Sequence, residues 1–362
     1  MATDTLTIQN ADSVEQTYEL MKARLARVVP DFELAYKAEL AFKINRLKRE
    51  RNAVILAHNY MEPALYHTVS DYKGDSLELA RISAQSDADV IVFCGVRFMA
   101  ETAKILNPAR TVLLPAEKAG CSLAESMTGD DVRELRKRFP GVPVVSYVNT
   151  YADVKAETDI CCTSSNAAKV VEDLMERGHN RVIFLPDEYL ARNVAADLNI
   201  PIIFPSLAKG KGENEPENEN PERVLIGWRG RCEVHEQFTV EDIENVRKQF
   251  PDTIVLAHPE CSPEVVAASD FSGSTRSIIE YVRKMDAPRY LLLTECSMGD
   301  NIIAENPEKD VLRLCSVRCP HMNLITLEDT LAALEKNRYE ITLPEDIMNR
   351  ARASLNRMLE IR

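Results

Sequence analysis

The segments VILAHNY at residues 54–60 and IVLAHPE at residues 254–260 decide the fold of this chain, because both join an apolar run to a similar polar ending. A third segment, VVSYVNT at residues 144–150, has the same form. Short β-branched runs that end in polar residues are typical of strands. Three similar segments spread along one chain indicate an internal repeat, so we expect three related structural units.

Each expected unit continues in the same way after its first strand. A helix start that carries Ser or Thr follows, in KGDSLELAR (73–81), CTSSNAAKV (162–170) and FSGSTRSII (271–279). Each unit then ends at a cysteine, and the three are Cys121, Cys232 and Cys319. The recurrence of strand ending, helix start and cysteine in one order supports the repeat.

The spacing between the strand endings and the cysteines also supports the repeat. Counted from Tyr60, Thr150 and Glu260, the cysteines follow after 61, 82 and 59 residues. The middle unit holds the low-complexity segment KGKGENEPENENPE (209–222), which is typical of a solvated insertion. Without about 20 residues of this segment, the middle spacing approaches the other two.

Apolar β-branched runs alternate with amphipathic stretches along the chain, which predicts parallel βαβ units in an α/β fold. We expect nine strands in three groups, at residues 52–57, 89–93, 111–114, 142–147, 181–185, 201–204, 253–256, 290–293 and 310–314. The predicted organisation is a helical lead-in (1–49), a first αβα unit (50–136), a second unit (137–245) with a flexible acidic insert (207–224), a third unit (246–324) and C-terminal helices (325–362).

The composition is that of an ordinary globular protein, with 45% hydrophobic and 28% charged residues. A net charge of −13 argues against nucleic acid and anionic membranes as partners, because both need a basic face. Residues 1–14 lack the basic and apolar regions of a secretory signal, and no apolar run has the length of a membrane span. We therefore expect a cytoplasmic protein, whose nine cysteines do not form a disulfide framework.

Parallel sheets present binding residues at the carboxyl ends of their strands, so the three cysteines converge if those ends face inward. A structural zinc site needs four closed ligands, and a Cys3His site with His235 or His321 is one alternative. A cubane iron–sulfur cluster fits better, because three thiolates hold three irons and leave the fourth open. Such an open iron is a Lewis acid for a hydroxyl or carboxylate oxygen.

Seven segments between residues 50 and 335 resemble the quinolinate synthase family in sequence and in order. They are AHNYMEPALYHTVSDYKGDSLELAR, AGCSLAES, SYVNTYADVKAETDICCTSSNA, FLPDEYLARNVA, GWRGRCEVHEQF, AHPECSPEVVAASDFSGSTRSI and CPHMNLITLE. The resemblance implies three similar three-layer αβα units with short parallel sheets about a pseudo-threefold axis. It also implies condensation of iminoaspartate with dihydroxyacetone phosphate to quinolinate, in de novo NAD biosynthesis, with L-aspartate oxidase as the upstream supplier.

The resemblance further implies a [4Fe–4S] cluster with one open iron site, and it assigns residues by motif. The cluster ligands are Cys121, Cys232 and Cys319. The substrate-binding residues are His58, Tyr60, Ser76, Tyr147, Asn149, Ser164, His235, His258, Glu260 and Thr275. Tyr60, His235 and Glu260 are the candidates for proton transfer, since His, Tyr and Glu side chains can serve as general acids and bases. Some members carry a denser Cys-x-x-Cys-x-x-Cys run, whereas this chain has only Cys315 and Cys319 there.

The residues by themselves leave simpler interpretations open. The helix-start residues Ser76, Ser164 and Thr275 could be plain N-caps, and His58 and His258 could simply cap a sheet. An enzyme alternative is a cluster-dependent hydro-lyase acting on another small dicarboxylate. A non-enzyme alternative is an iron–sulfur or zinc sensor, but a sensor needs an output module such as a basic helix-turn-helix, and the sequence offers none.

Overall fold

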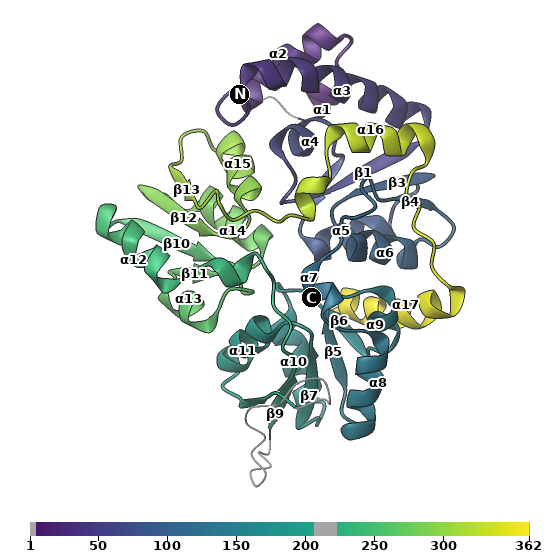
Figure 1. The fold of residues 1–362 in the computed structure, drawn as a ribbon, viewed down its shortest axis with the longest axis vertical. Coiled ribbons are helices and arrows are strands. Elements are labelled where there is room, and N and C mark those ends of the chain that lie inside the picture. The colour runs from purple at the N-terminus through teal and green to yellow at the C-terminus, as the bar shows by residue number, and fades with distance from the viewer. Residues whose placement is uncertain (1–4, 206–222, 362) are drawn as a thin grey trace.

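The computed structural model describes residues 5–205 and 223–361. Three separate parallel sheets organise these residues into three units, which surround a common centre (Figure 1). The first unit is blue, the second is teal and the third is green in Figure 1. This arrangement confirms the predicted α/β fold of three similar units with helical termini.

The first unit contains a sheet of strand order β2-β1-β3-β4. Its strands are β1 (Ala53–His58), β2 (Tyr72–Gly74), β3 (Val90–Cys94) and β4 (Thr111–Leu113). Its helices are α4 (Pro63–Thr68), α5 (Ser76–Ala84), α6 (Arg97–Leu106), α7 (Ser122–Glu125) and α8 (Gly129–Arg138).

The second unit contains a sheet of order β6-β5-β7-β9-β8. Its strands are β5 (Val144–Tyr147), β6 (Ile160–Cys162), β7 (Arg181–Leu185), β8 (Ile202–Ile203) and β9 (Val224–Gly227). Its helical segments are α9 (Ala152–Ala156), α10 (Ala167–Glu176), α11 (Glu188–Asp197), the short 3₁₀ turn η1 (His235–Gln237) and α12 (Val240–Gln249).

The third unit repeats the order of the first, as β11-β10-β12-β13. Its strands are β10 (Thr253–Ala257), β11 (Phe271–Ser272), β12 (Arg289–Leu293) and β13 (Val311–Arg313). Its helical segments are α13 (Pro263–Ala268), α14 (Thr275–Lys284), α15 (Cys296–Glu305) and the 3₁₀ turn η2 (Met322–Leu324).

Helices at both ends of the chain complete the molecule. They are α1 (Thr5–Gln9), α2 (Val14–Leu25), α3 (Asp31–Glu50), α16 (Leu327–Lys336) and α17 (Glu345–Glu360). Helix α16 packs on the terminal helix α3 and on β3 of the first unit, whereas α17 packs on α6, α9 and β6 and so joins the first unit to the second (Figure 1). Within the described ranges, no helix is long and apolar enough to cross a membrane.

Four strands were not predicted from the sequence. The edge strands β2, β6 and β11 are two or three residues long, which is too short for a periodic signal. In the middle unit the predicted strand at 201–204 is present as the edge strand β8, and the unpredicted strand β9 lies between it and β7. Strand β9 pairs with β7, as β4 pairs with β3. The predicted insert at 207–224 lies outside the described residues except at its end, where Val224 begins β9.

The three units contact one another in a cycle. In each unit one helix follows the first strand (α4, α9 or α13) and another follows the second full-length strand (α6, α11 or α15). The second type of helix packs on the first type in the next unit, as α6 on α9, α11 on α13 and α15 on α4. Pro63 and Pro263 begin α4 and α13 in the same way, since Pro loses no helical hydrogen bond at this position.

Candidate active site

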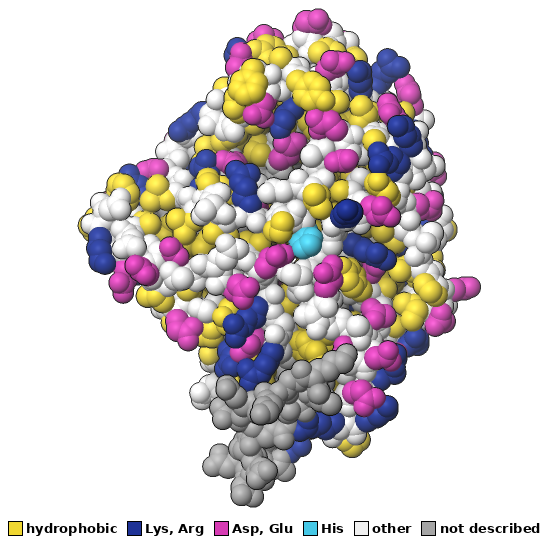
Figure 2. Space-filling model, viewed as in Figure 1, with side chains coloured by type: hydrophobic (Ala, Val, Ile, Leu, Met, Phe, Trp, Pro, Cys, Tyr) yellow, Lys and Arg dark blue, Asp and Glu magenta, His cyan; other side chains and the backbone are white. Residues whose placement is uncertain are grey.

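A cavity lies where the carboxyl ends of the three sheets meet. All thirteen residues proposed from the sequence line it: His58, Tyr60, Ser76, Cys121, Tyr147, Asn149, Ser164, Cys232, His235, His258, Glu260, Thr275 and Cys319. Figure 2 shows a histidine at the surface near the middle of this face, where the three units of Figure 1 meet. Side chains of both charges are interspersed around it. The repeat therefore brings its polar endings to one place.

His58 and His258 have the same fixed orientation at the ends of equivalent strands. In each ring, Nδ1 accepts a hydrogen bond of 3.3 Å from the backbone N–H two residues on, which belongs to Tyr60 or Glu260. Burial lowers the pKa of His58 to about 4 and that of His258 to about 3, so both rings are neutral at pH 7. The proton must then be on Nε2, and each ring offers an Nε2–H donor. For His258 this nitrogen lies 3.4 Å from Ser164 Oγ.

Glu260 is a buried carboxylate that receives hydrogen bonds from the second unit. Tyr147 O–H donates to Oε1, Asn149 Nδ2 lies 3.4 Å from the same oxygen, and His235 Nδ1 lies 2.9 Å from Oε2. Burial alone would raise the pKa of Glu260. The imidazoles of His258 and His235, with the hydrogen bonds from His235 and Tyr147, outweigh this effect and hold the pKa below its ordinary value. Glu260 is therefore an ionised acceptor in this structure.

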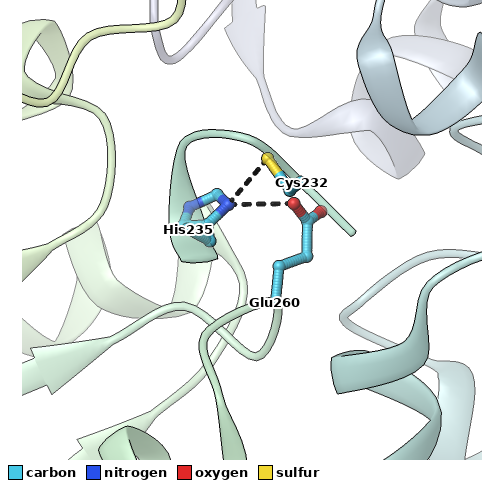
Figure 3. A group of neighbouring side chains, drawn as sticks. All are labelled: Cys232, His235 and Glu260. Atoms are coloured by element: carbon cyan, nitrogen blue, oxygen red, sulfur yellow. Dashed lines mark hydrogen bonds and ion pairs between the residues drawn. The ribbon is translucent and has the colours of Figure 1, made fainter. Parts of the chain in front are cut away.

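His235 links Glu260 to Tyr60 through a hydroxyl. Figure 3 shows one ring nitrogen of His235 facing both Glu260 and the sulfur of Cys232, which is 3.3 Å away. Because an ionised carboxylate only accepts, this Nδ1 donates to Glu260. The other ring nitrogen, Nε2, lies 3.0 Å from Thr294 Oγ1, which in turn lies 2.6 Å from Tyr60 Oη. The result is a continuous hydrogen-bond chain from Tyr60 through Thr294 and His235 to Glu260.

Thr294 and Asn59 belong to the site, although the sequence analysis did not name them. Thr294 directly follows β12 and connects residues of all three units. Asn59 Nδ2 donates to Thr275 Oγ1 at 2.9 Å, and its Oδ1 accepts from Tyr66 O–H at 3.0 Å. Both follow apolar strand runs, in YLLLTE and VILAHNY, and this position at the end of a parallel strand was the signal available in the sequence.

The hydroxyls at the helix starts are not N-caps. Helix α5 is capped by the side chain of Asp75, and α14 is capped by that of Ser274. Ser76 and Thr275 are the first helical residues instead, and Ser164 precedes the cap position of α10. The interpretation of these three residues as plain caps is therefore wrong. Their hydroxyls line the cavity at the positive ends of helices, where an anion is favoured.

The three cavity cysteines lie in equivalent loops, after β4, β9 and β13. Burial raises the pKa of each thiol, to about 12 for Cys121 and about 11 for Cys319. Amide N–H groups two and three residues further on oppose this effect in all three loops. The charges also interact, because Cys319 raises the pKa of Cys121 and Cys121 raises that of Cys232. The three groups are therefore protonated thiols here, and a bound metal would have to supply the positive charge that ionises them.

The chain also offers a mixed set of metal donors at this place. Cys232, His235 and Glu260 each present one ligand atom, and these atoms lie within 4.8 Å of one another, so the group could hold a metal ion. Both nitrogens of His235 already have partners, in Glu260 and Thr294. The sulfur atoms of the three cavity cysteines are softer donors than this mixed set and are alike in kind, and such donors fit an iron–sulfur cluster. The other six cysteines do not line the cavity; five are buried, and Cys315 is exposed.

Three αβα units that surround one cavity lined by histidines, a buried carboxylate and three cysteines define the class of an α/β enzyme. The family model for quinolinate synthetase A proteins (NadA) matches residues 42–360. Quinolinate synthase 2 of Mesorhizobium japonicum is 50% identical over 349 residues, which cover 96% of this chain and 99% of that protein. The quinolinate synthase of Agrobacterium fabrum is 52% identical over 338 residues, covering 93% and 90%. The chain belongs to the quinolinate synthase family.

Proposed function

We propose that this protein is a quinolinate synthase that condenses iminoaspartate with dihydroxyacetone phosphate, with loss of phosphate and water, in NAD biosynthesis. The observation that carries the proposal is the convergence of all thirteen motif residues on one cavity of a chain that belongs to this family. L-aspartate oxidase is the upstream supplier of the imine in this proposal. A reducing cytoplasm suits an enzyme with nine cysteines, all of them free.

Cys121, Cys232 and Cys319 hold a [4Fe–4S] cluster with one open iron in this proposal. Their equivalent loops and the N–H donors repeated in each loop support this assignment. When bound, the cluster supplies a Lewis-acid iron that favours the loss of a substrate hydroxyl.

Neutral donors bind the anionic substrates, which carry two carboxylates and a phosphate. No Lys or Arg is among the described residues that line the cavity. Instead, His58 and Tyr60 orient the phosphate-bearing substrate, and His258 contributes a further Nε2–H donor. The carboxylates are held by Tyr147, Asn149, Ser164 and Thr275. The positive ends of α5 and α14, where Ser76 and Thr275 lie, add to this attraction.

Glu260, His235 and Tyr60 move the protons of the condensation and the dehydrations. Glu260 is the general base of this proposal, because its carboxylate is ionised and can accept a proton from a substrate carbon or nitrogen. Tyr60 can give its hydroxyl proton to a substrate oxygen, and Thr294 and His235 connect this hydroxyl to Glu260. The chain thus connects an acid at one side of the cavity to a base at the other.

Anaerobic purification followed by an assay for quinolinate tests this proposal. The reconstituted protein should form quinolinate only when both substrates are present, and omission of either substrate is the control. A protein with full iron content that makes no quinolinate would contradict the proposal. Dehydration of a hydroxy dicarboxylate by the same preparation would instead support the hydro-lyase alternative.

A further inference from the structure

One buried side chain bridges two backbone carbonyls around each of Tyr60, Asn149 and Glu260. Asn301 Nδ2 donates to the carbonyls of Asn59 and Met61, at 3.2 and 2.9 Å. Asn193 Nδ2 donates to the carbonyls of Pro259 and Cys261, at 2.8 and 3.0 Å. Lys155 Nζ donates to the carbonyls of Val148 and Thr150, the first at 2.8 Å. In every case the two carbonyls belong to the residues immediately before and after the cavity residue.

Two of these bridges cross from one unit to the next. Asn193 lies on α11 of the second unit and holds the loop of the third, and Asn301 lies on α15 of the third unit and holds the loop of the first. The two asparagines have the same position, twelve residues after the first residue of β7 and of β12. They lie on α11 and α15, the helices that pack on α13 and α4 of the next unit. Equivalent placement in two units indicates a common role.

The bridge in the second unit is built differently, from a lysine of the same unit. The corresponding position on α6 is Thr102, whose hydroxyl is bonded to Phe98 O within its own helix. Its neighbour Glu101 instead accepts from the backbone N–H of Ala152 at 2.9 Å. Lys155, from α9 of the second unit itself, supplies the carbonyl bridge. Each loop therefore has its bridge, although only two bridges are asparagines.

The asparagines act as donors in these contacts. Asn301 is 2% exposed and its Oδ1 has no hydrogen-bond partner, so its amide group serves the two carbonyls alone. An amide NH₂ has two N–H groups, which suits two carbonyls on either side of one residue. Changing Asn to Asp removes these donors while the shape is kept, and it places a carboxylate against two carbonyl oxygens.

We propose that Asn193 and Asn301 are positioning residues, which fix Glu260 and Tyr60 in the cavity by holding their loops across the unit boundaries. The inference rests on the proposed function for its kinetic consequence, but the positioning itself does not. Glu260 and Tyr60 are the two ends of the hydrogen-bond chain described above, and they come from different units. Packing of the units around the axis thereby sets the distance between the acid and the base.

The test compares Asn193→Asp and Asn301→Asp with the matched control Asn45→Asp. Asn45 is also 2% exposed, donates from Nδ2 to the Thr68 carbonyl at 3.0 Å and has an unpartnered Oδ1, but it does not line the cavity. We expect kcat to fall about 10- to 100-fold in the first two variants, because small displacements of reacting groups are costly. The control should keep kcat within about twofold, and iron content should be unchanged in all three.

Two readouts separate positioning from a general loss of stability. In the Glu260→Gln background, Asn193→Asp should lower kcat by less than about threefold. In the same way, Asn301→Asp should lower kcat by less than about threefold in the Tyr60→Phe background. Amide hydrogen exchange should rise at residues 258–262 in Asn193→Asp and at 58–62 in Asn301→Asp, and at neither loop in the control. If an aspartate variant does not fold, Asn→Ser at the same position, which keeps one donor, takes its place.

The outcomes are distinct. Equal effects of Asn193→Asp in both backgrounds, or unchanged exchange of the loops, would overturn the inference. If the protein makes no quinolinate, the proposed function fails, but the exchange measurement still decides whether the asparagines position the loops.

Discussion

Replacing Thr294 by Val removes one hydroxyl from the centre of the site and keeps the shape of the side chain. Thr294 is 1% exposed, and its Oγ1 lies 2.6 Å from Tyr60 Oη and 3.0 Å from His235 Nε2. In Thr294→Val both groups lose the partner that they share. The change therefore tests whether this hydroxyl connects the acid to the base.

The magnitude follows from the number of buried groups that stay without a partner. One buried unsatisfied group costs about 1–3 kcal/mol. Tyr60 Oη also lies 3.4 Å from His235 Nε2, so these two can approach and bond directly. We therefore expect the free energy of unfolding to fall by about 1–3 kcal/mol and not by twice that amount. Because the direct bond requires Tyr60 to leave its position, kcat should fall about 10- to 100-fold.

The matched control is Thr253→Val. Thr253 is also buried, but its Oγ1 has no hydrogen-bond partner, so the same chemical change costs nothing there and should leave kcat unchanged. Thr294→Ser keeps the hydroxyl and should recover most of the activity. Denaturant unfolding and anaerobic quinolinate formation measure both effects. Equal kcat values for the two Val variants would refute the reasoning.

The remaining predictions concern the base, the cluster ligands and a buried histidine. Glu260→Gln should lower turnover by about 10²-fold or more with the visible spectrum of the cluster unchanged, and surviving turnover would make Glu260 a positioning residue. Cys319→Ser should leave a folded, colourless and inactive protein after anaerobic reconstitution, whereas Cys315→Ser, which changes an exposed thiol outside the cavity, should keep about three-quarters or more of the iron; loss of the cluster in both would contradict the assignment. Burial holds the pKa of His67 well below its usual value, with Lys73 and Arg24 adding to the shift, so the unfolded chain binds one more proton at low pH. His67 should therefore lower the free energy of unfolding by about 1.4 kcal/mol for each pH unit below about pH 6.5. The His67→Leu variant should lack this part of the pH dependence.

The site was predictable to the extent that its residues lie next to strong local patterns. His58, Tyr60, Glu260 and their counterparts directly follow apolar runs, and the carboxyl ends of parallel strands meet at one edge of a sheet. The three cysteines recur once in each unit, so the repeat alone was enough to group them. Family resemblance supplied their expected roles, and the structure supplied their common cavity.

Other members of the site carry no local signal of their function. Thr294 is 234 residues from Tyr60 along the chain, and Asn301 is 240 residues from Met61. A buried polar residue on a helix or strand end is common, and only its partner shows what it does. The caps Asp75 and Ser274 illustrate the same limit, because they stand directly beside the hydroxyl residues for which capping was considered.

The sequence by itself determined the three-unit α/β repeat and the residues of the polar strand endings, because these depend on hydrophobic periodicity and on short-range order along the chain. Only the tertiary structure decided that β9 is the inner strand and β8 the edge strand of the second sheet, since both have similar apolar sequences and pairing alone distinguishes them. It also decided the hydrogen-bond chain through Thr294 and the asparagine bridges between units. These contacts join groups that are far apart in sequence, and their geometry exists only once the three units have packed around their common axis.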